Sequence, residues 1–349
     1  MRTKLRKLEK RISIHNLLSD LEPDRVVLDV RSPSEYEQGH IIGTHNLPLF
    51  SDEERAEVGT IYKRQTPEKA MIRGLELVGK KMAWYVKTAN KLAKSKKVAV
   101  MCARGGKRSG SLGWLLNLVG FDVQILNGGY KAYRNEMQVF FEEQALKIII
   151  IGGKTGTGKT EILQQLKQKG AQILDLEGLA NHKGSAFGAL GELPQPRSEH
   201  YENILYHEIK QLDYSKTVYV ENESRLVGHC TIPQGLWDQM QNATVYNVEI
   251  PHADRVQRLI VDYAQFSVEE LIAAFKRIEK KLGNLNLQKA EKALLKGDFA
   301  TATEIALFFY DKTYSFGLEN KRKDKPIDFK FDHSDMEKIA ESILNYKKL

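Results

Sequence analysis

A cysteine opens a glycine-rich, basic loop in the first half of the chain. Residues 102–108 read Cys-Ala-Arg-Gly-Gly-Lys-Arg and follow the apolar run 98–101, which predicts a buried strand, while residues 109–119 predict the next helix. Free amides and the positive helix end at such a turn favour an anion and a thiolate. The loop can therefore bind a tetrahedral oxyanion and present a nucleophile to it, with Cys102, Arg104 and Arg108 as candidate catalytic residues. The alternative is that Cys102 packs as a small hydrophobic residue in the core, but this does not explain the cations clustered after it.

A second glycine-rich loop lies near the middle of the chain. Residues 153–160 read Gly-Lys-Thr-Gly-Thr-Gly-Lys-Thr, after an apolar strand at 145–151 and before a helix at 161–169. This is the phosphate-binding pattern G-x-x-x-x-G-K-[ST] in its required context, which argues against a chance glycine turn. Its amides would cradle phosphates, its lysine would add a point charge and its last threonine would offer a hydroxyl to Mg²⁺. The candidate phosphate-binding residues are Gly153, Gly156, Gly158, Lys159, Thr160 and Arg225.

An acidic segment follows a later strand. Residues 217–225 form an apolar strand that ends in Glu221, Glu223 and Arg225. We expect either glutamate, with Thr160, to hold Mg²⁺ or its waters, and Arg225 to neutralise phosphate. No bound organic cofactor is expected.

A polar loop separates these two segments. Residues 175–188 carry three glycines among many polar groups, after a strand at 172–174. This composition suits a loop that faces phosphate or a base better than a core, although a lone histidine is usually an ordinary surface residue. The candidate substrate-contacting residues are Asp175, Glu177, His182, Lys183 and Ser185.

Short apolar strands alternate with helices around these loops, as at 25–31, 98–101 and 120–126. That alternation predicts an α/β fold with parallel sheets and chemistry at the carboxyl ends of the strands. We place a first domain at 1–137 with a helical insertion at about 52–97, a linker or polar helix at 138–145, and a P-loop domain at 146–349. From about residue 267 the P-loop domain is expected to be helical: Ser267 and Glu270 predict a capping box, and Leu271, Phe275, Ile278 and Leu282 an apolar helix face.

Charge and cysteine content limit the class of protein. The 349 residues hold 53 Lys and Arg against 45 Asp and Glu, a net charge of +8 that indicates a polyanionic partner. The lysines of the 52–97 insertion and of the helix after Ser267 suit RNA contact and a solvated face equally well. The two cysteines, Cys102 and Cys230, indicate no disulfide framework, and Cys230 is interpreted as structural. Because neither a signal peptide nor a membrane span is recognisable, we expect a cytoplasmic protein without membrane partners.

Several of these motifs resemble those of a known domain. The strand 28–31, the turn 39–44, the Cys102 loop and the Asn-Gly-Gly-Tyr segment 127–130 together look like a rhodanese domain spanning about residues 10–137. Rhodaneses carry sulfur on the cysteine as a persulfide. The Cys-x5-Arg interval from Cys102 to Arg108 is one residue longer than in many sulfurtransferases. It resembles rhodanese-like phosphatases, and it leaves room for a tetrahedral group.

Combined with the P-loop, the strings at 176–185 and 220–225 make the whole chain resemble the bacterial tRNA 2-selenouridine synthases. The resemblance implies a transferase that replaces the sulfur of wobble 2-thiouridine by selenium from selenophosphate, through an S-geranyl-2-thiouridine made from geranyl diphosphate. It also implies tRNA partners with lysine, glutamate and glutamine acceptors, and the enzyme that produces selenophosphate.

On this resemblance, the P-loop would bind a diphosphate without hydrolysing a nucleotide, and Cys102 would take the selenium or assist its delivery. Two alternatives remain at the level of the sequence. One is a rhodanese-like phosphatase or sulfurtransferase coupled to an ATPase, and the other is a non-catalytic RNA-binding sulfur carrier.

Overall fold

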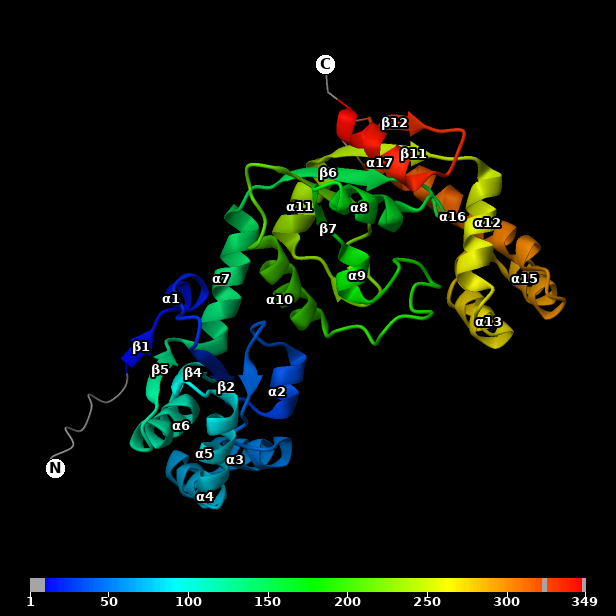
Figure 1. Ribbon diagram of the computed structural model, residues 1–349. Helices are drawn as coiled ribbons and strands as arrows, with labels where there is room; N and C mark the ends of the chain where they lie inside the picture. The colour runs from blue at the N-terminus through cyan, green and yellow to red at the C-terminus, as the bar shows by residue number, and fades with distance from the viewer. Residues whose placement is uncertain (1–9, 322–324, 347–349) are drawn as a thin grey trace. The chain divides into compact units, whose positions relative to one another are not determined.

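The structure is a computed structural model that describes residues 10–321 and 325–346 (Figure 1). The chain divides into two compact units, Met1–Phe140 and Phe141–Leu349. Each unit contains a five-stranded sheet in which every pairing is parallel. The predicted α/β class is therefore confirmed, with the cysteine loop in the first unit and the P-loop in the second.

The first sheet has the strand order β1-β5-β4-β2-β3. Its central strand β4 is fully buried from Val98 to Met101, as expected for a parallel strand covered on both faces. Because β4 leads directly to Cys102, the most rigid strand of the sheet positions the cysteine. The strands are β1 (Lys10–Ile12), β2 (Val26–Asp29), β3 (His45–Asn46), β4 (Lys97–Met101) and β5 (Asp122–Leu126).

Seven helices accompany this sheet among the described residues. The insertion expected at 52–97 is three helices, α3 to α5, and it ends at Leu92. Within it, Tyr85 is fully buried while Trp84 is 48% exposed, so only the tryptophan is available to a partner. The helices are α1 (Ile14–Ser19), α2 (Pro33–Gln38), α3 (Asp52–Arg64), α4 (Pro67–Gly79), α5 (Met82–Leu92), α6 (Lys107–Leu118) and α7 (Gly129–Glu143).

Helix α7 covers most of the segment expected between the domains. The segment 138–145 was expected to be a linker or polar helix, and α7 runs through it to Glu143. Met137 and Phe141, four residues apart, are both buried. Their shared apolar face explains why the segment is helical rather than an extended linker.

The second sheet has the order β12-β11-β6-β8-β7. Helices α8 and α17 pack side by side against it, since Leu163 and Ile339 belong to one buried cluster with strand residue Ile151 (Figure 1). The strands are β6 (Lys147–Gly152), β7 (Gln172–Leu174), β8 (Thr217–Glu221), β11 (Thr244–Glu249) and β12 (Ile327–Lys330), and a separate antiparallel pair is formed by β9 (Leu226–Val227) and β10 (Cys230–Thr231).

The edge strand β12 corrects the expectation of a wholly helical C-terminal part. Its four residues alternate apolar and charged, a period-2 pattern too short to be distinctive. It forms because Tyr246 to Glu249 of β11 offer an unpaired edge in parallel register. Cys230, interpreted as structural, is fully buried.

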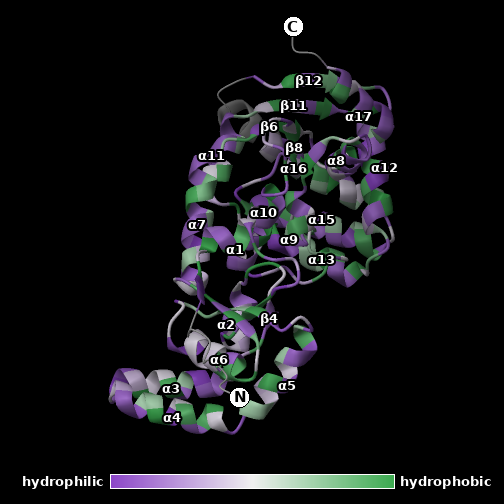
Figure 2. Cartoon of the chain, turned by 60° about the vertical axis from the view of Figure 1, so that its left-hand side comes forward, coloured by the Kyte–Doolittle hydropathy of each residue, from purple (hydrophilic) through white to green (hydrophobic). Residues whose placement is uncertain are grey.

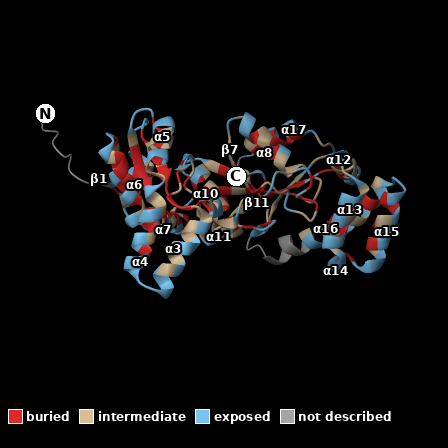
Figure 3. Cartoon of the chain, turned by 90° about the horizontal axis from the view of Figure 1, so that it is seen from below, coloured by how far each residue is buried: buried red, intermediate tan, exposed pale blue. Residues whose placement is uncertain are grey.

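The helices of the second unit include a cluster with its own core. Residues of α13, α15 and α16 share a buried apolar cluster, and α13 and α15 show alternating polar and apolar faces (Figure 2) with buried and exposed sides (Figure 3). The helices are α8 (Lys159–Gln168), α9 (Leu176–Ala180), α10 (Ser198–Ile209), α11 (Gln234–Asn242), α12 (His252–Tyr263), α13 (Val268–Arg277), α14 (Glu279–Leu282), α15 (Asn284–Leu295), α16 (Phe299–Lys321) and α17 (Met336–Asn345).

The capping box of Ser267 and Glu270 is confirmed at the start of α13. The single apolar face expected from Leu271 to Leu282 is divided between two helices, because Ile278 ends α13 and α14 begins at Glu279. Within the described part of the chain, no helix is long and apolar enough to cross a bilayer.

The turn after β5 forms backbone hydrogen bonds with the cysteine loop. The Tyr130 amide donates to the Cys102 carbonyl at 2.9 Å, and the Lys131 amide donates to the Ala103 carbonyl at 3.0 Å. Gly129 has φ +59, and a Cβ there would lie 2.1 Å from the Cys102 oxygen. Only glycine permits so close an approach of two backbones. The Asn-Gly-Gly-Tyr segment therefore fixes the path of the loop.

We expect Gly129→Ala to lower the unfolding free energy more than Gly120→Ala, the matched control. Gly120 has φ +92 but open space where its Cβ would lie, so alanine there costs only backbone strain, about 1–2 kcal/mol. Alanine at position 129 adds a clash worth about 1–3 kcal/mol. The free energy of unfolding of both variants is measured by urea denaturation of the full chain, followed by hydrogen exchange in peptides from β4 and α6. Equal losses of unfolding free energy in the two variants would show that the close approach of Gly129 to the Cys102 backbone does not contribute to stability.

Candidate functional site

The cysteine loop surrounds a buried sulfur with hydrogen-bond donors. Cys102 is 3% exposed, and its Sγ lies 3.3 Å from the Oγ of Ser109 in the first turn of α6. Burial raises the pKa of the Cys102 thiol, but the Ser109 hydroxyl and the amides of Arg104, Ser109 and Gly106 outweigh it and lower the pKa below the ordinary value. The loop thus favours the nucleophilic thiolate.

The two arginines proposed for this loop differ in their surroundings. Arg104 is exposed, whereas Arg108 is mostly buried and forms two hydrogen bonds with the Glu35 carboxylate, one of them 3.1 Å from Nη2 to Oε1. Burial lowers the pKa of Arg108, while the charges of Glu35 and Cys102 raise it above its usual value overall. Glu35 therefore holds the Arg108 guanidinium in place, and the positive charge of this guanidinium also stabilises the Cys102 thiolate.

Sequence reasoning missed Glu35 and Ser109 as members of this site. Ser109 sits seven residues after the cysteine, so a helix beginning at Lys107 already predicts it in the first turn beside the sulfur. Glu35 carries no comparable signal, because it comes from α2 and meets Arg108 only through the tertiary fold.

A buried ion pair anchors the neighbouring strand. The guanidinium of Arg31 binds the Asp29 carboxylate through several hydrogen bonds and also donates to the Gly39 carbonyl at 2.7 Å. Its carbon lies 3.8 Å from the centre of the Tyr130 ring. These contacts join the end of β2 to the turn at Gly39 and to the start of α7, which explains the motifs at 28–31 and 39–44 as structural supports.

An open groove of about 690 Å³ adjoins the first turn of α6. Lys107 lies at its edge, and the half-exposed Trp114 and the exposed Leu75 line its apolar wall. The groove gives a planar or apolar group access to the helix that begins at the cysteine loop.

The P-loop joins β6 to α8 in the second unit. Gly158 is the residue before α8 and has φ +83, the left-handed conformation that frees the first amides of the helix. The ammonium of Lys159 donates to the Gly153 carbonyl at 3.3 Å, and the Gly153 amide donates to the Tyr314 hydroxyl at 2.7 Å. The contact within the loop and the hydrogen bond to Tyr314 of α16 thus hold its shape.

A pocket of about 1070 Å³ lies over this loop. It brings together most of the residues proposed for phosphate and substrate binding. Those that line it are Gly153, Gly156, Gly158, Lys159, Thr160, Glu177, His182, Lys183, Ser185 and Glu223. Three do not: Arg225 is exposed outside the pocket, Glu221 is fully buried, and Asp175 accepts a hydrogen bond from the Gly178 amide at 2.8 Å as the cap of α9.

The pocket also contains cations that were not assigned to it. Arg258 of α12 lines it beside the P-loop, and Arg277, Lys280 and Lys281 reach it from α13 and α14. The last three were interpreted from the sequence as the polar side of a helix for RNA or solvent. Their real position depends on how the helices fold back, which periodicity does not reveal.

Three glutamates gather beside Thr160. The Thr160 hydroxyl lies 3.1 Å from Glu177 and 3.5 Å from Glu221, and the Glu177 amide donates to Glu221 at 2.7 Å. Burial, followed by the neighbouring carboxylates, raises the pKa of Glu221 well above the ordinary value, and burial and Glu177 do the same for Glu223. A cation would relieve this crowding of negative charge.

Mg²⁺ suits these groups because it takes one or two carboxylates and keeps several waters. Thr160 with Glu221 and Glu223 would hold it, close to bound phosphate. No complete set of three His, Cys, Asp or Glu ligands occurs among residues 10–321 and 325–346, so waters and phosphate oxygens would complete its shell.

The polar loop contributes a histidine with a neutral ring. Burial lowers the pKa of His182, although Glu177 opposes this effect. Its Nδ1 accepts from the Gly184 amide at 3.2 Å, which leaves Nε2 to carry the proton of the neutral ring. Lys183 pairs with Glu192 at 3.3 Å. His182 can therefore donate a hydrogen bond without adding charge to the pocket.

Comparison with known proteins agrees with the order of the two domains. The AAA domain of tRNA 2-selenouridine synthase matches residues 146–346, and the rhodanese-like domain matches residues 13–136. A tRNA 2-selenouridine synthase from Bdellovibrio bacteriovorus is 34% identical over 93% of this chain and 99% of its own length. The chain belongs to the tRNA 2-selenouridine synthase family.

Other members and one solved domain extend this comparison. A family member from Nitrosomonas europaea is 30% identical over 89% of this chain and 94% of its own length. The N-terminal domain of a Clostridium difficile 630 protein described as ATP/GTP binding is 42% identical, with a TM-score of 0.35, and covers 36% of this chain and 98% of that one. The two family members and the two domain matches confirm the family resemblance seen in the sequence.

We expect the Cys102 thiol to be alkylated at a lower pH than an ordinary thiol, and Ser109→Ala to move this titration upward because a donor to the thiolate is lost. The rate of iodoacetamide labelling against pH measures both, in a Cys230→Ala background. Burial raises the pKa of Cys230 to about 11, so a Cys102→Ala protein, which keeps only this second thiol, serves as the unreactive control. An unchanged titration in Ser109→Ala would contradict the role given to Ser109.

Proposed function

We propose that this protein converts wobble 2-thiouridine of tRNA to 2-selenouridine in two steps, prenyl transfer at the P-loop and selenium delivery at the cysteine loop. The observation that carries the proposal is the presence, in a chain of this family, of two separate anion cradles with different chemistry. One surrounds a cysteine whose thiolate is stabilised, and the other has a lysine and a threonine hydroxyl but no thiol among the described residues that line it.

The first step activates the sulfur as a leaving group. The sulfur of 2-thiouridine attacks the first carbon of geranyl diphosphate, the carbon–oxygen bond breaks, diphosphate leaves and the N3 proton of the base is lost. The P-loop amides and Lys159 hold the diphosphate and stabilise its growing charge. Mg²⁺, held by Thr160 and the glutamates, would neutralise further phosphate charge. The base is then an S-geranyl thioether.

The cysteine loop serves the second step. Its amides and the Arg108 charge hold the phosphoryl end of selenophosphate, whose selenium attacks C2 of the base and displaces geranylthiol. Attack of the Cys102 thiolate on phosphorus then breaks the phosphorus–selenium bond and leaves selenium on the base. Water hydrolyses the phosphocysteine to phosphate. Transfer of selenium itself to sulfur would instead reduce phosphorus to phosphite, so phosphoryl transfer balances the electrons.

The tRNA backbone requires a positive surface. Exposed lysines cluster on α5 and the segment before β4, around the half-exposed Trp84. Cations of this kind bind phosphates, and an exposed aromatic ring can stack on a base. The proposed tRNA-contacting lysines of this surface are Lys80, Lys87, Lys91, Lys94 and Lys96.

We expect Cys102→Ser to accumulate S-geranyl-2-thiouridine, because it removes the group that serves the second step. We expect Lys159→Ala to lower the rate of product formation by about 100-fold or more, because it removes a charge that stabilises the first step. Thiolated tRNA is incubated with protein, geranyl diphosphate, Mg²⁺ and selenophosphate, and its nucleosides are analysed by mass spectrometry. Cys230→Ser and Lys167→Ala, at a buried thiol and at an exposed lysine of the same α8, are the matched controls.

Two results would contradict the proposal. Normal selenouridine formation by Cys102→Ser would remove the cysteine from the second step. Unmodified tRNA with the wild type, combined with turnover of ATP or of a phosphate ester without RNA, would favour the ATPase-coupled phosphatase that the Cys-x5-Arg loop also permits.

A further inference from the structure

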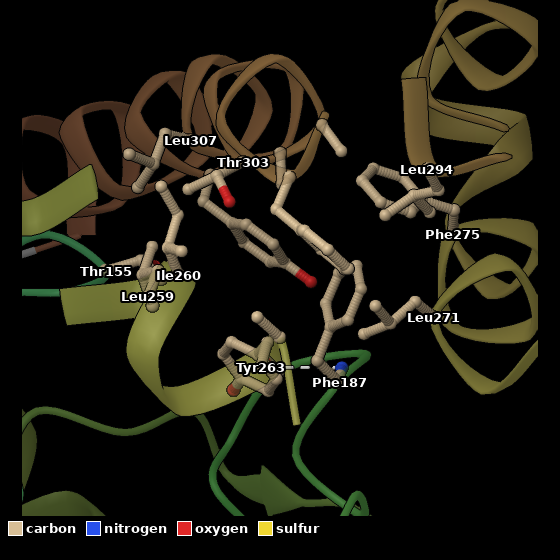
Figure 4. Close-up of a pocket in the computed structure, with 16 residues that line it drawn as sticks. Thr155, Phe187, Leu259, Ile260, Tyr263, Leu271, Phe275, Leu294, Thr303 and Leu307 are labelled. Atoms are coloured by element: carbon tan, nitrogen blue, oxygen red, sulfur yellow. Dashed lines mark hydrogen bonds between the residues drawn. The ribbon is translucent and has the colours of Figure 1, made fainter. Parts of the chain in front are cut away.

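A narrow apolar pocket lies inside the helical part of the second unit. Figure 4 shows its labelled side chains pointing toward one another from helices and loops of the second unit. Leu259 and Tyr263 come from α12, Phe275 from α13, Leu294 from α15 and Leu307 from α16, while Phe187 comes from the loop before α10. Most of the lining atoms are carbon.

This pocket adjoins the phosphate pocket. Thr155, Ser185, Leu259, Tyr263 and Tyr310 line both of them. Thr155 belongs to the P-loop itself, and the buried guanidinium of Arg255 donates to its carbonyl at 2.9 Å. One end of the apolar pocket therefore lies against the P-loop.

Two polar groups of the pocket have partners within the protein. The Tyr310 hydroxyl accepts from the Ala186 amide at 3.1 Å, and the Ser185 hydroxyl accepts from the Phe187 amide at 3.2 Å. A purine base needs free donors and acceptors to be recognised, whereas a hydrocarbon chain needs none. The arrangement suits an amphiphile with an anionic head and an apolar tail.

We propose that this pocket binds the isoprenoid chain of the diphosphate held by the P-loop. The inference rests on the proposed function, because it assumes a diphosphate at Lys159. The free space is only about 50 Å³, so a ten-carbon chain displaces side chains as it enters. The depth of the pocket then limits the chain length that the protein accepts.

The proposal is tested by calorimetry with the full chain, Mg²⁺ and a series of ligands: inorganic pyrophosphate, dimethylallyl diphosphate, geranyl diphosphate and ATP. Each buried methylene adds about fourfold to affinity, so geranyl diphosphate binds at least about 50-fold more tightly than pyrophosphate, and dimethylallyl diphosphate lies between them. ATP gains nothing from the pocket.

Variants that fill the pocket distinguish binding of the isoprenoid chain from binding of the diphosphate. Ala306→Phe, and independently Ala264→Phe on the facing helix, weaken geranyl diphosphate to about the level of pyrophosphate and leave pyrophosphate affinity unchanged. Ala300→Phe makes the same change at an exposed position of α16 and is the matched control. Circular dichroism identifies a variant that fails to fold, and the other variant then decides.

Each other outcome overturns the inference in a recognisable way. Pyrophosphate binding that requires Lys159, with no added affinity for the geranyl chain, refutes the chain site and leaves the phosphate site standing. ATP binding that is lost in Ala306→Phe makes the pocket a base site. Absence of both pyrophosphate and geranyl diphosphate binding refutes the inference and the proposed P-loop chemistry together.

Discussion

Both sites depend on unpaired backbone amides at the point where a central parallel strand meets a helix. The first amides of any helix have no partner within it. In β4–α6 and in β6–α8, these amides lie at the turn that joins the strand to the helix. Tertiary contacts fix the shape of both turns, through the Gly129 backbone against Cys102 and through Tyr314 against Gly153. A change in either contact would move the donors and weaken the anion site.

The side chains around these two similar cradles set opposite electrostatics. At the cysteine loop, Ser109 and the loop amides lower the pKa of the thiol, so that negative charge on the protein is stable. At the P-loop, burial raises the pKa of Glu221 and Glu223, so that negative charge there requires a cation. The first site thus offers a nucleophile, and the second offers a place for a metal and a leaving group.

Local patterns in the sequence predicted the loops well. The strand, glycine loop and helix around Cys102 and Lys159 depend on neighbouring residues, and the structure has them where they were expected. Long-range partners left no such signal. Glu35 meets Arg108 across more than 70 residues of chain, and Arg277 turns to the phosphate pocket only because α13 folds back. Asp175, a candidate substrate-contacting residue, caps α9 through its side chain.

In the proposed function, the two sites act on the same base in turn. Every described residue that lines the phosphate pocket and the apolar pocket belongs to the second unit, and the cysteine with its partners Ser109 and Glu35 belongs to the first. In that proposal the residues of the second unit alkylate the base, and those of the first unit then deliver selenium to it. A thioether is stable in water, unlike a charged intermediate, which makes S-alkylation a suitable way to keep the base activated between the two proposed steps.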